Sequence, residues 1–315
     1  QSTRAEAPVL RVGVVQGNIP FDEKGIKRQE LAPKQLRALQ NKSAELEAQG
    51  AQFLMCTESS YPYFVPRDAA TYFREDHPWR IRKGFSAPIM LGALTRNLQD
   101  REERPYNSAL MLESDSRFTA RFDKIFLLVF GEYIPFLETF PSLEKMLPKN
   151  TSHFNRGKEI VPFPLTHEGV DYRLGPMICY EDILPEFNRK LGAHHPHLLV
   201  NITNDSWFGD TSEPWEHMAL SVYRAVEMRT DLVRAVNTGV SAFIDATGKV
   251  YNQTYAVDPK ITPKPVDGIV DDVRLVEGGH SFFMRFGNVF SWLCLLFVLG
   301  VWQVWPRLHA RNEDA

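Results

Sequence analysis

The chain has 315 residues and a net charge of −3 at pH 7, with 36 Lys and Arg against 39 Asp and Glu. The basic residues are dispersed, which argues against the positive surface of a nucleic-acid-binding protein. Cys56, Cys179 and Cys294 are odd in number and far apart, so they give no metal-ligand spacing and no disulfide framework. At this length we expect one large domain with an appendage.

The first part of the chain predicts a strand–helix–strand unit. Residues 10–16 form a valine-rich strand, residues 33–49 have the leucine spacing of a helix that stops at Gly50, and residues 52–56 form a short apolar strand. In such a unit both strands end at the same edge of a sheet, where ligands bind. Glu58, just past the second strand, is expected at that edge.

Later apolar runs predict further strands at 89–94, 107–112, 172–179, 198–202, 232–236, 241–244 and 269–273. Between them, residues 215–228 predict a helix, because apolar side chains recur at helical spacing. Its expected apolar face consists of Trp215, Met218, Ala219, Val222 and Val226.

The last apolar run, 289–305, contains no charged residue and lies between Arg285 and Arg307. Its length is at the lower edge of the ~17 to 25 residues that span a bilayer, and neighbouring phenylalanines extend it. Tryptophans near its ends suit the membrane interfaces. We expect a transmembrane helix over 281–306 and a polar cytoplasmic tail over 307–315. The alternative is a buried core helix.

Cys179 ends a predicted strand and precedes a tyrosine and two acids. A nucleophilic cysteine reacts as thiolate and needs a nearby cation, base or helix N-terminus; without one, a buried core cysteine is the commoner case. Lys124 and Glu132 bracket the apolar stretch 125–130, and Glu58 ends another strand. A lysine beside a carboxylate and a thiol stabilises an oxyanion while the carboxylate moves protons. Each of these charges, taken alone, also fits an ordinary surface residue.

The order Glu58, Lys124, Cys179 resembles the nitrilase (carbon–nitrogen hydrolase) superfamily, and the surrounding motifs resemble its membrane branch, the bacterial apolipoprotein N-acyltransferases. The matching segments include Val15-Gln16-Gly17-Asn18-Ile19-Pro20, Phe130-Gly131-Glu132-Tyr133-Ile134-Pro135, Ile178-Cys179-Tyr180-Glu181, Asn204-Asp205-Ser206-Trp207-Phe208-Gly209 and Asn237-Thr238-Gly239-Val240-Ser241.

The resemblance implies an α/β fold, a nitrilase-like four-layer α-β-β-α sandwich over residues 9–280. It makes Glu58 the general base, Lys124 the oxyanion-stabilising cation and Cys179 the nucleophile. The supporting residues would be Glu132, Tyr180 and Glu181, and the substrate-binding residues Trp207 and Phe130. It implies no cofactor and no metal, and the run His194-His195-Pro196-His197 is interpreted as a solvated loop.

Members of this branch move an acyl chain from a phospholipid to the cysteine as a thioester, then to the α-amine of the diacylglyceryl-cysteine of an apolipoprotein, by two-step covalent catalysis. We therefore expect an N-acyltransferase at the bacterial inner membrane, facing the extracytoplasmic side, with phospholipid and apolipoprotein as partners. One alternative is a membrane-tethered amidase or nitrilase, in which water takes the acyl group. The other is a non-catalytic protein that binds lipoprotein or lipid.

The sequence departs from the branch in three places. Cys56 and Thr57 stand where a tryptophan and a proline usually precede the first glutamate, and Val129 replaces the usual proline before Phe130. Members also carry several membrane helices ahead of the catalytic domain, so we expect residues 1–8 to be a linker truncated after such helices.

Overall fold

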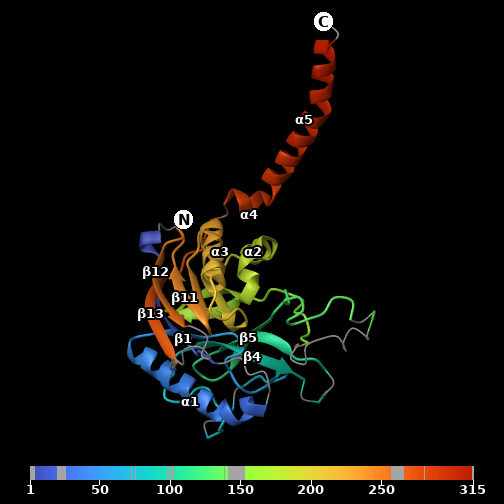
Figure 1. Cartoon of the computed structure of the whole chain (residues 1–315). Coiled ribbons are helices and arrows are strands. Elements are labelled where there is room, and N and C mark those ends of the chain that lie inside the picture. The colour runs from blue at the N-terminus through green and yellow to red at the C-terminus, as the bar shows by residue number, and fades with distance from the viewer. Residues whose placement is uncertain are drawn as a thin grey trace.

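The computed structural model describes residues 4–19, 26–71, 73–74, 76–97, 99–100, 103–137, 139–140, 153–256, 266–279 and 281–313, with the backbone alone in 26–29 and 304–313. Within these residues two β-sheets pack against each other, and helices cover their outer faces (Figure 1).

The first sheet contains seven of the described strands, in the order β13-β1-β2-β4-β5-β6, with β3 paired to β4. Its strands are β1 (Val9–Gln16), β2 (Phe53–Cys56), β3 (Val65–Pro66), β4 (Ile89–Arg96), β5 (Tyr106–Leu112), β6 (Phe118–Asp123) and β13 (Asp267–Arg274). Strands β1 and β2 are parallel and are joined by α1 (Ile26–Ala48), so the predicted strand–helix–strand unit is confirmed. The helix begins at Ile26 and contains Pro33 in its interior, so the predicted start at residue 33 is wrong.

The second sheet contains six of the described strands, in the order β12-β11-β10-β9-β8-β7. They are β7 (Phe163–His167), β8 (Val170–Ile178), β9 (Leu198–Thr203), β10 (Leu232–Val236), β11 (Gly239–Ile244) and β12 (Val250–Ala256). Strands β8, β9 and β10 are parallel, so their carboxyl ends meet at one edge. Two helices follow at that edge, α2 (Pro185–Gly192) and α3 (Glu213–Met228).

Side-chain alternation along β1 divides the core into layers. Val12 and Val14 belong to the core that joins the two sheets, whereas Val15 packs with Leu36 and Leu39 of α1. The layers are therefore α1, the first sheet, the second sheet, and α2 with α3. This is the predicted four-layer sandwich.

The apolar face predicted for α3 is wrong. Trp215, Ala219 and Val226 are exposed, and Met218 and Val222 are only half-buried. The helix instead buries a face that is half polar, made of Pro214, His217, Ser221, Arg224, Ala225 and Met228. The reason is that α3 packs on buried charged residues at the end of the second sheet, described below, which need polar partners.

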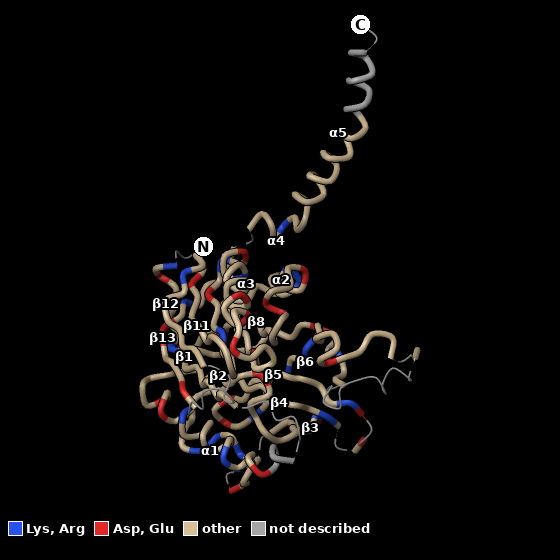
Figure 2. Tube along the Cα trace, viewed as in Figure 1, with Lys and Arg blue, Asp and Glu red and all other residues tan. Residues whose placement is uncertain are grey.

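The C-terminal apolar run forms two helices, α4 (Phe282–Phe286) and α5 (Val289–Glu313), because Gly287 ends α4 with a φ of +62°. Helix α5 leads away from the sandwich (Figure 1), and its described side chains carry no charge (Figure 2). They are exposed, with Phe290 at 73% and Phe297 at 72%, so α5 is not a buried core helix. Across the described residues, no helix has both the length and the apolar character needed to cross a membrane. The side chains of Trp305 and of the predicted tail lie outside the described residues.

Candidate active site

The three residues predicted to carry the chemistry lie close behind strand ends. Lys124 directly follows β6 and Cys179 directly follows β8, while Glu58 comes shortly after β2. All three are buried, with exposed fractions of 1% for Lys124, 5% for Cys179 and 6% for Glu58. Strands β2 and β6 belong to the first sheet and β8 to the second. The candidate site is therefore assembled from both sheets.

Lys124 bridges two carboxylates. Its Nζ donates to Glu58 Oε1 at 3.2 Å and to Glu132 Oε1 at 3.0 Å. Asn107 Nδ2, from β5, donates to the same two oxygens at 2.7 and 3.0 Å. Sequence reasoning missed Asn107, which begins the predicted strand 107–112 and stands beside Ser108, so it gave no clear signal of a site residue. One cation and one amide thus hold two buried carboxylates together.

The protonation states of this cluster follow from burial and charge. Burial lowers the pKa of Lys124, but Cys179, Glu58 and Glu132 outweigh it and hold that pKa well above 10.5. Burial raises the pKa of Glu58, and Lys124 partly offsets this. Burial also raises the pKa of the Cys179 thiol well above 9.0, again partly offset by Lys124. Lys124 is therefore charged at neutral pH, and Cys179 rests as a thiol that needs a base to react.

The backbone is strained where two of these residues lie. Cys179 has a φ of +54°, and Ser59, directly after Glu58, has a φ of +50°. Residues without glycine's freedom adopt this conformation at a cost of about 1–3 kcal/mol, and such strain clusters at functional sites. Gly92 of β4 permits the Glu58 turn, because a Cβ there would lie 2.4 Å from the Thr57 carbonyl oxygen.

Glu181 connects the Cys179 strand end with the loop after Lys124. Its carboxylate accepts backbone N–H bonds from Ile178 at 2.9 Å, Ile125 at 2.6 Å and Phe126 at 3.1 Å. Burial raises its pKa to about 8, and the three amides oppose that rise. Because Ile178 belongs to the second sheet and Ile125 follows the first, Glu181 fixes the two parts of the site relative to each other.

A buried charged cluster lies behind Tyr180, whose ring stacks on His217 with centroids 5.3 Å apart. His217 contacts Asp182 Oδ1 through Nε2 at 2.9 Å and Asp205 Oδ1 through Nδ1 at 3.0 Å. Arg234 also binds Asp182. Burial lowers the pKa of His217, but the carboxylates outweigh it and raise that pKa to about 9. The sequence analysis did not assign Asp182, Asp205 or Arg234 to the site.

Asp205, Glu213 and His217 offer ligand atoms within 4.8 Å of one another, which is compatible in distance with a metal ion. Both ring nitrogens of His217 are already engaged by carboxylates, and Arg234 Nη2 lies 4.0 Å from Asp205 Oδ2. An added cation would meet two existing positive charges in a buried place, which is costly. We therefore assign these residues to support of the fold around Tyr180.

The other predicted residues divide into two groups. Glu132, Tyr180 and Glu181 lie with the three central residues, and Glu132 Oε2 also accepts the Leu128 N–H at 2.8 Å. Phe130 and Trp207 lie at the surface instead, with exposed fractions of 68% and 42%. Further exposed apolar side chains surround Phe130 in the sequence, namely Phe126, Val129, Phe136 and Phe140.

Comparison with known proteins gives a consistent family. Residues 11–262 match the family model described as carbon-nitrogen hydrolase. The apolipoprotein N-acyltransferase of Geobacter metallireducens is 37% identical over 237 residues, which are 73% of this chain and 43% of the relative. That of Nitrosomonas europaea is 31% identical over 306 residues, which are 95% of this chain and 56% of the relative. The chain thus spans about half the length of these curated relatives.

Solved structures agree on the fold. A mutant amidase of the nitrilase superfamily from Nesterenkonia AN1 has a TM-score of 0.55 and 17% identity, covering 84% of this chain and 90% of the amidase. At this identity the likeness concerns the fold alone.

Proposed function

The chain belongs to the carbon–nitrogen hydrolase family, and from this premise we propose that it is an N-acyltransferase. It would move an acyl chain from a phospholipid, through a thioester on Cys179, to the α-amine of the diacylglyceryl-cysteine of an apolipoprotein. The observation that carries the proposal is the buried Lys124, which binds Glu58 and Glu132 and interacts electrostatically with Cys179. The names of the curated relatives support the choice of a transferase.

In the first half-reaction, Glu58 takes the proton of the Cys179 thiol as the sulfur attacks the ester carbonyl of the phospholipid. The carbonyl oxygen becomes an oxyanion, which Lys124 stabilises. When the carbon–oxygen bond breaks, protonated Glu58 gives its proton to the leaving alkoxide, and a lysophospholipid departs. The raised pKa of Glu58 suits it as the base that accepts the thiol proton and as the acid that later donates this proton to the leaving alkoxide.

In the second half-reaction, the α-amine of the acceptor attacks the thioester carbonyl, and Lys124 again stabilises the oxyanion. Glu58 takes a proton from the attacking amine and passes it to the Cys179 sulfur as the carbon–sulfur bond breaks. The products are the amide and the original thiol, so the cycle balances. Glu132, Tyr180 and Glu181 hold the reacting groups in place, and no cofactor is required.

An acyl-chain substrate is supported by the apolar side chains around the site. Phe130 and Phe136 are 68% and 73% exposed, and both have positive φ values, of +65° and +63°. Clusters of exposed apolar side chains mark sites for proteins, lipids or apolar ligands, whereas a small polar amide gains nothing from them. We propose that Phe130 and Trp207 contact the acyl chain.

The transferase and hydrolase functions differ in the acceptor of the acyl group, which is the α-amine of the peptide in one and water in the other. We expect the protein, given phosphatidylethanolamine and a diacylglyceryl-cysteine peptide, to yield more N-acylated peptide than free fatty acid. Mass spectrometry measures both products. The matched control is the same peptide with an acetylated α-amine, which should remain unchanged. Fatty acid released at the same rate with either peptide, and no N-acylated product, would identify an amidase-like hydrolase.

We propose that α5 lies in a bilayer, with the sandwich on the extracytoplasmic side of the bacterial inner membrane. Support comes from its exposed apolar side chains, such as Phe290 and Trp302, and from its direction away from the sandwich (Figure 1). Arg307 and Arg311 follow α5's apolar part, and under the positive-inside rule they support a cytoplasmic position for the tail. In this placement the protein would meet both phospholipid and lipoprotein at the outer surface of the inner membrane.

Cys294, exposed on α5, allows this placement to be tested. An environment-sensitive fluorophore on Cys294, in a Cys179→Ala background, should shift to the blue when vesicles of phosphatidylethanolamine and phosphatidylglycerol are added. The control carries Cys294→Ser and the same label at Glu45→Cys on α1, and its emission should not change. In cells, protease added to intact spheroplasts should digest the sandwich. An unshifted Cys294 label or a protected sandwich contradicts the placement.

A further inference from the structure

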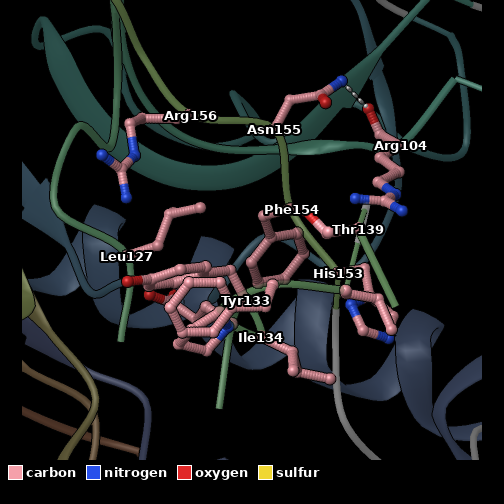
Figure 3. A pocket seen from close by; sticks show the side chains of 13 residues that line it. Arg104, Leu127, Tyr133, Ile134, Thr139, His153, Phe154, Asn155 and Arg156 are labelled. Carbon is pink, nitrogen blue, oxygen red and sulfur yellow. Dashed lines mark hydrogen bonds between the residues drawn. The ribbon is translucent and has the colours of Figure 1, made fainter. Parts of the chain in front are cut away.

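A pocket of about 410 Å³ adjoins the cluster around Lys124, because Glu132 belongs to its lining. Figure 3 shows this pocket from close by. Its lining combines apolar side chains, including Ile134 and Phe154, with the cationic side chains of Arg104 and Arg156. Figure 3 shows the two arginines on opposite sides of Tyr133 and Phe154. Glu132 belongs both to the lining of this pocket and to the candidate active site, where it binds Lys124.

The segment that carries Arg156 is attached directly to the backbone of the active-site residues. Phe154 N–H donates to the Glu132 carbonyl at 3.0 Å, and Gly157 N–H donates to the Lys124 carbonyl at 2.8 Å. Gly157 is needed for this approach, because a Cβ there would lie 2.0 Å from the Asp123 carbonyl oxygen. Arg156 is thus held beside the strand end that presents Lys124.

Arg104 is attached to the same segment from the other side. Asn155 Nδ2 donates to the Arg104 carbonyl at 2.6 Å, and Asn155 N–H donates to the Pro105 carbonyl at 2.8 Å. On the Arg104 side these bonds use the backbone and not the guanidinium. Hydrogen bonds to the backbone therefore hold both segments in place, and Arg104 and Arg156 line the same pocket.

The pocket carries an excess of positive charge. Glu132 is the sole acid among its described lining residues, and its carboxylate is occupied by Lys124, Asn107 and the Leu128 N–H. Within the described part of the chain, neither Arg104 nor Arg156 forms an ion pair with an acid. The Arg156 guanidinium instead lies 5.3 Å from the centre of the Tyr133 ring.

We propose that this pocket binds the phosphodiester of the phospholipid acyl donor, with Arg104 and Arg156 as the groups that recognise it. The inference rests on the proposed function and extends it by assigning the part of the site that selects the donor. Guanidinium groups match phosphate oxygens in charge and in paired hydrogen-bond geometry. The apolar lining suits the glycerol and the first methylenes of the chains. A headgroup held here places the neighbouring ester on the Lys124 side of Glu132.

The test compares two acyl donors that differ in the phosphate. In the Arg104→Gln/Arg156→Gln protein, KM for Cys179 acylation by phosphatidylglycerol should rise about 10-fold, as for loss of a partly exposed charge-assisted hydrogen bond. Acylation by the p-nitrophenyl ester of the same fatty acid, which has no phosphate, should be unchanged. Arg74→Gln, at an exposed arginine outside the pocket, is the matched control. An unchanged KM for the phospholipid, or an equal loss with both donors, overturns the assignment.

A binding arm keeps the inference separate from the transferase proposal. Calorimetric titration with dihexanoylphosphatidylglycerol should show binding to the unaltered protein and about 10-fold weaker binding to the double variant. This result supports the pocket even if no acyl transfer occurs, which would overturn the proposed function alone. Dihexanoylglycerol, which lacks the phosphate, should bind equally to both proteins. Inorganic phosphate that binds as tightly as the lipid would identify a free-anion site and overturn the lipid assignment, as would absence of phospholipid binding.

Discussion

Cys179→Ala should abolish the acyl-enzyme while leaving the fold intact. In the proposed mechanism the sulfur forms the covalent intermediate, and alanine keeps the Cβ that already occupies the strained backbone at φ +54°. Intact-mass analysis after incubation with phospholipid should therefore show an adduct on the unaltered protein and none on the variant. Circular dichroism should give equal spectra for the two.

Cys56 provides the matched control for this experiment. It also ends a strand and is fully buried, and burial raises its pKa to about 12. Its side chain packs in the core between the first sheet and α1, with Leu36 and Leu39, and within the described part of the chain it does not hydrogen-bond to Lys124. Cys56→Ala should keep the adduct. A thioester on the Cys179→Ala protein would assign the nucleophile to another residue and remove the central element of the proposed mechanism.

Lys124→Ala should slow acylation of Cys179 by about 10²- to 10³-fold, equivalent to roughly 3 to 4 kcal/mol. The charge that Lys124 stabilises is fully developed only in the tetrahedral intermediate, so the effect should appear in the rate of the chemical step. Stopped-flow acylation by a p-nitrophenyl ester measures that rate without requiring the lipid. Lys42→Ala, which removes a lysine paired with Glu45 on α1, is the control and should react at the unaltered rate.

Removing Lys124 also changes its two carboxylate neighbours. Glu58 and Glu132 would remain buried together without their cation, and the pKa of Glu58, which burial raises and Lys124 lowers, must rise further. Thermal unfolding separates this cost from the loss of catalysis, because a folded variant with a slow chemical step supports the assigned role. A folded Lys124→Ala protein that acylates at the unaltered rate would exclude Lys124 from the mechanism.

The sequence predicts the strands in the middle of each sheet well, because these strands are buried and appear as apolar runs. The strands it missed include β6, β7 and β12, which lie at sheet edges and are partly exposed. Edge strands bury only part of their side chains, so their apolar signal is weak. Pro164 in β7 weakens it further.

The same distinction separates the predicted from the missed parts of the site. Glu58 and Cys179 follow predicted strands, and Lys124 belongs with them to sequence motifs, which made the three residues visible in the sequence. Asp182, Asp205 and Arg234 become partners only through contacts between distant segments, such as Arg234 on β10 reaching Asp182 after β8. No local pattern marks a buried charge whose partner lies 52 residues away. The wrong apolar face of α3 has the same cause, because that helix packs against these charges.

The candidate site is divided between two sheets, so its residues come together only when the sheets dock. Cys179 follows a strand of one sheet, whereas Lys124 and Glu58 follow strands of the other. Glu181 links the two parts by accepting hydrogen bonds from the backbone of Ile125 and of Ile178, which requires both segments to be in place. A chain whose sheets have formed but not yet docked has a thiol without a base or a cation beside it. Under the mechanism proposed above, such a chain would be inert toward lipid esters, and a newly made molecule would not acylate itself or its neighbours before the two sheets dock.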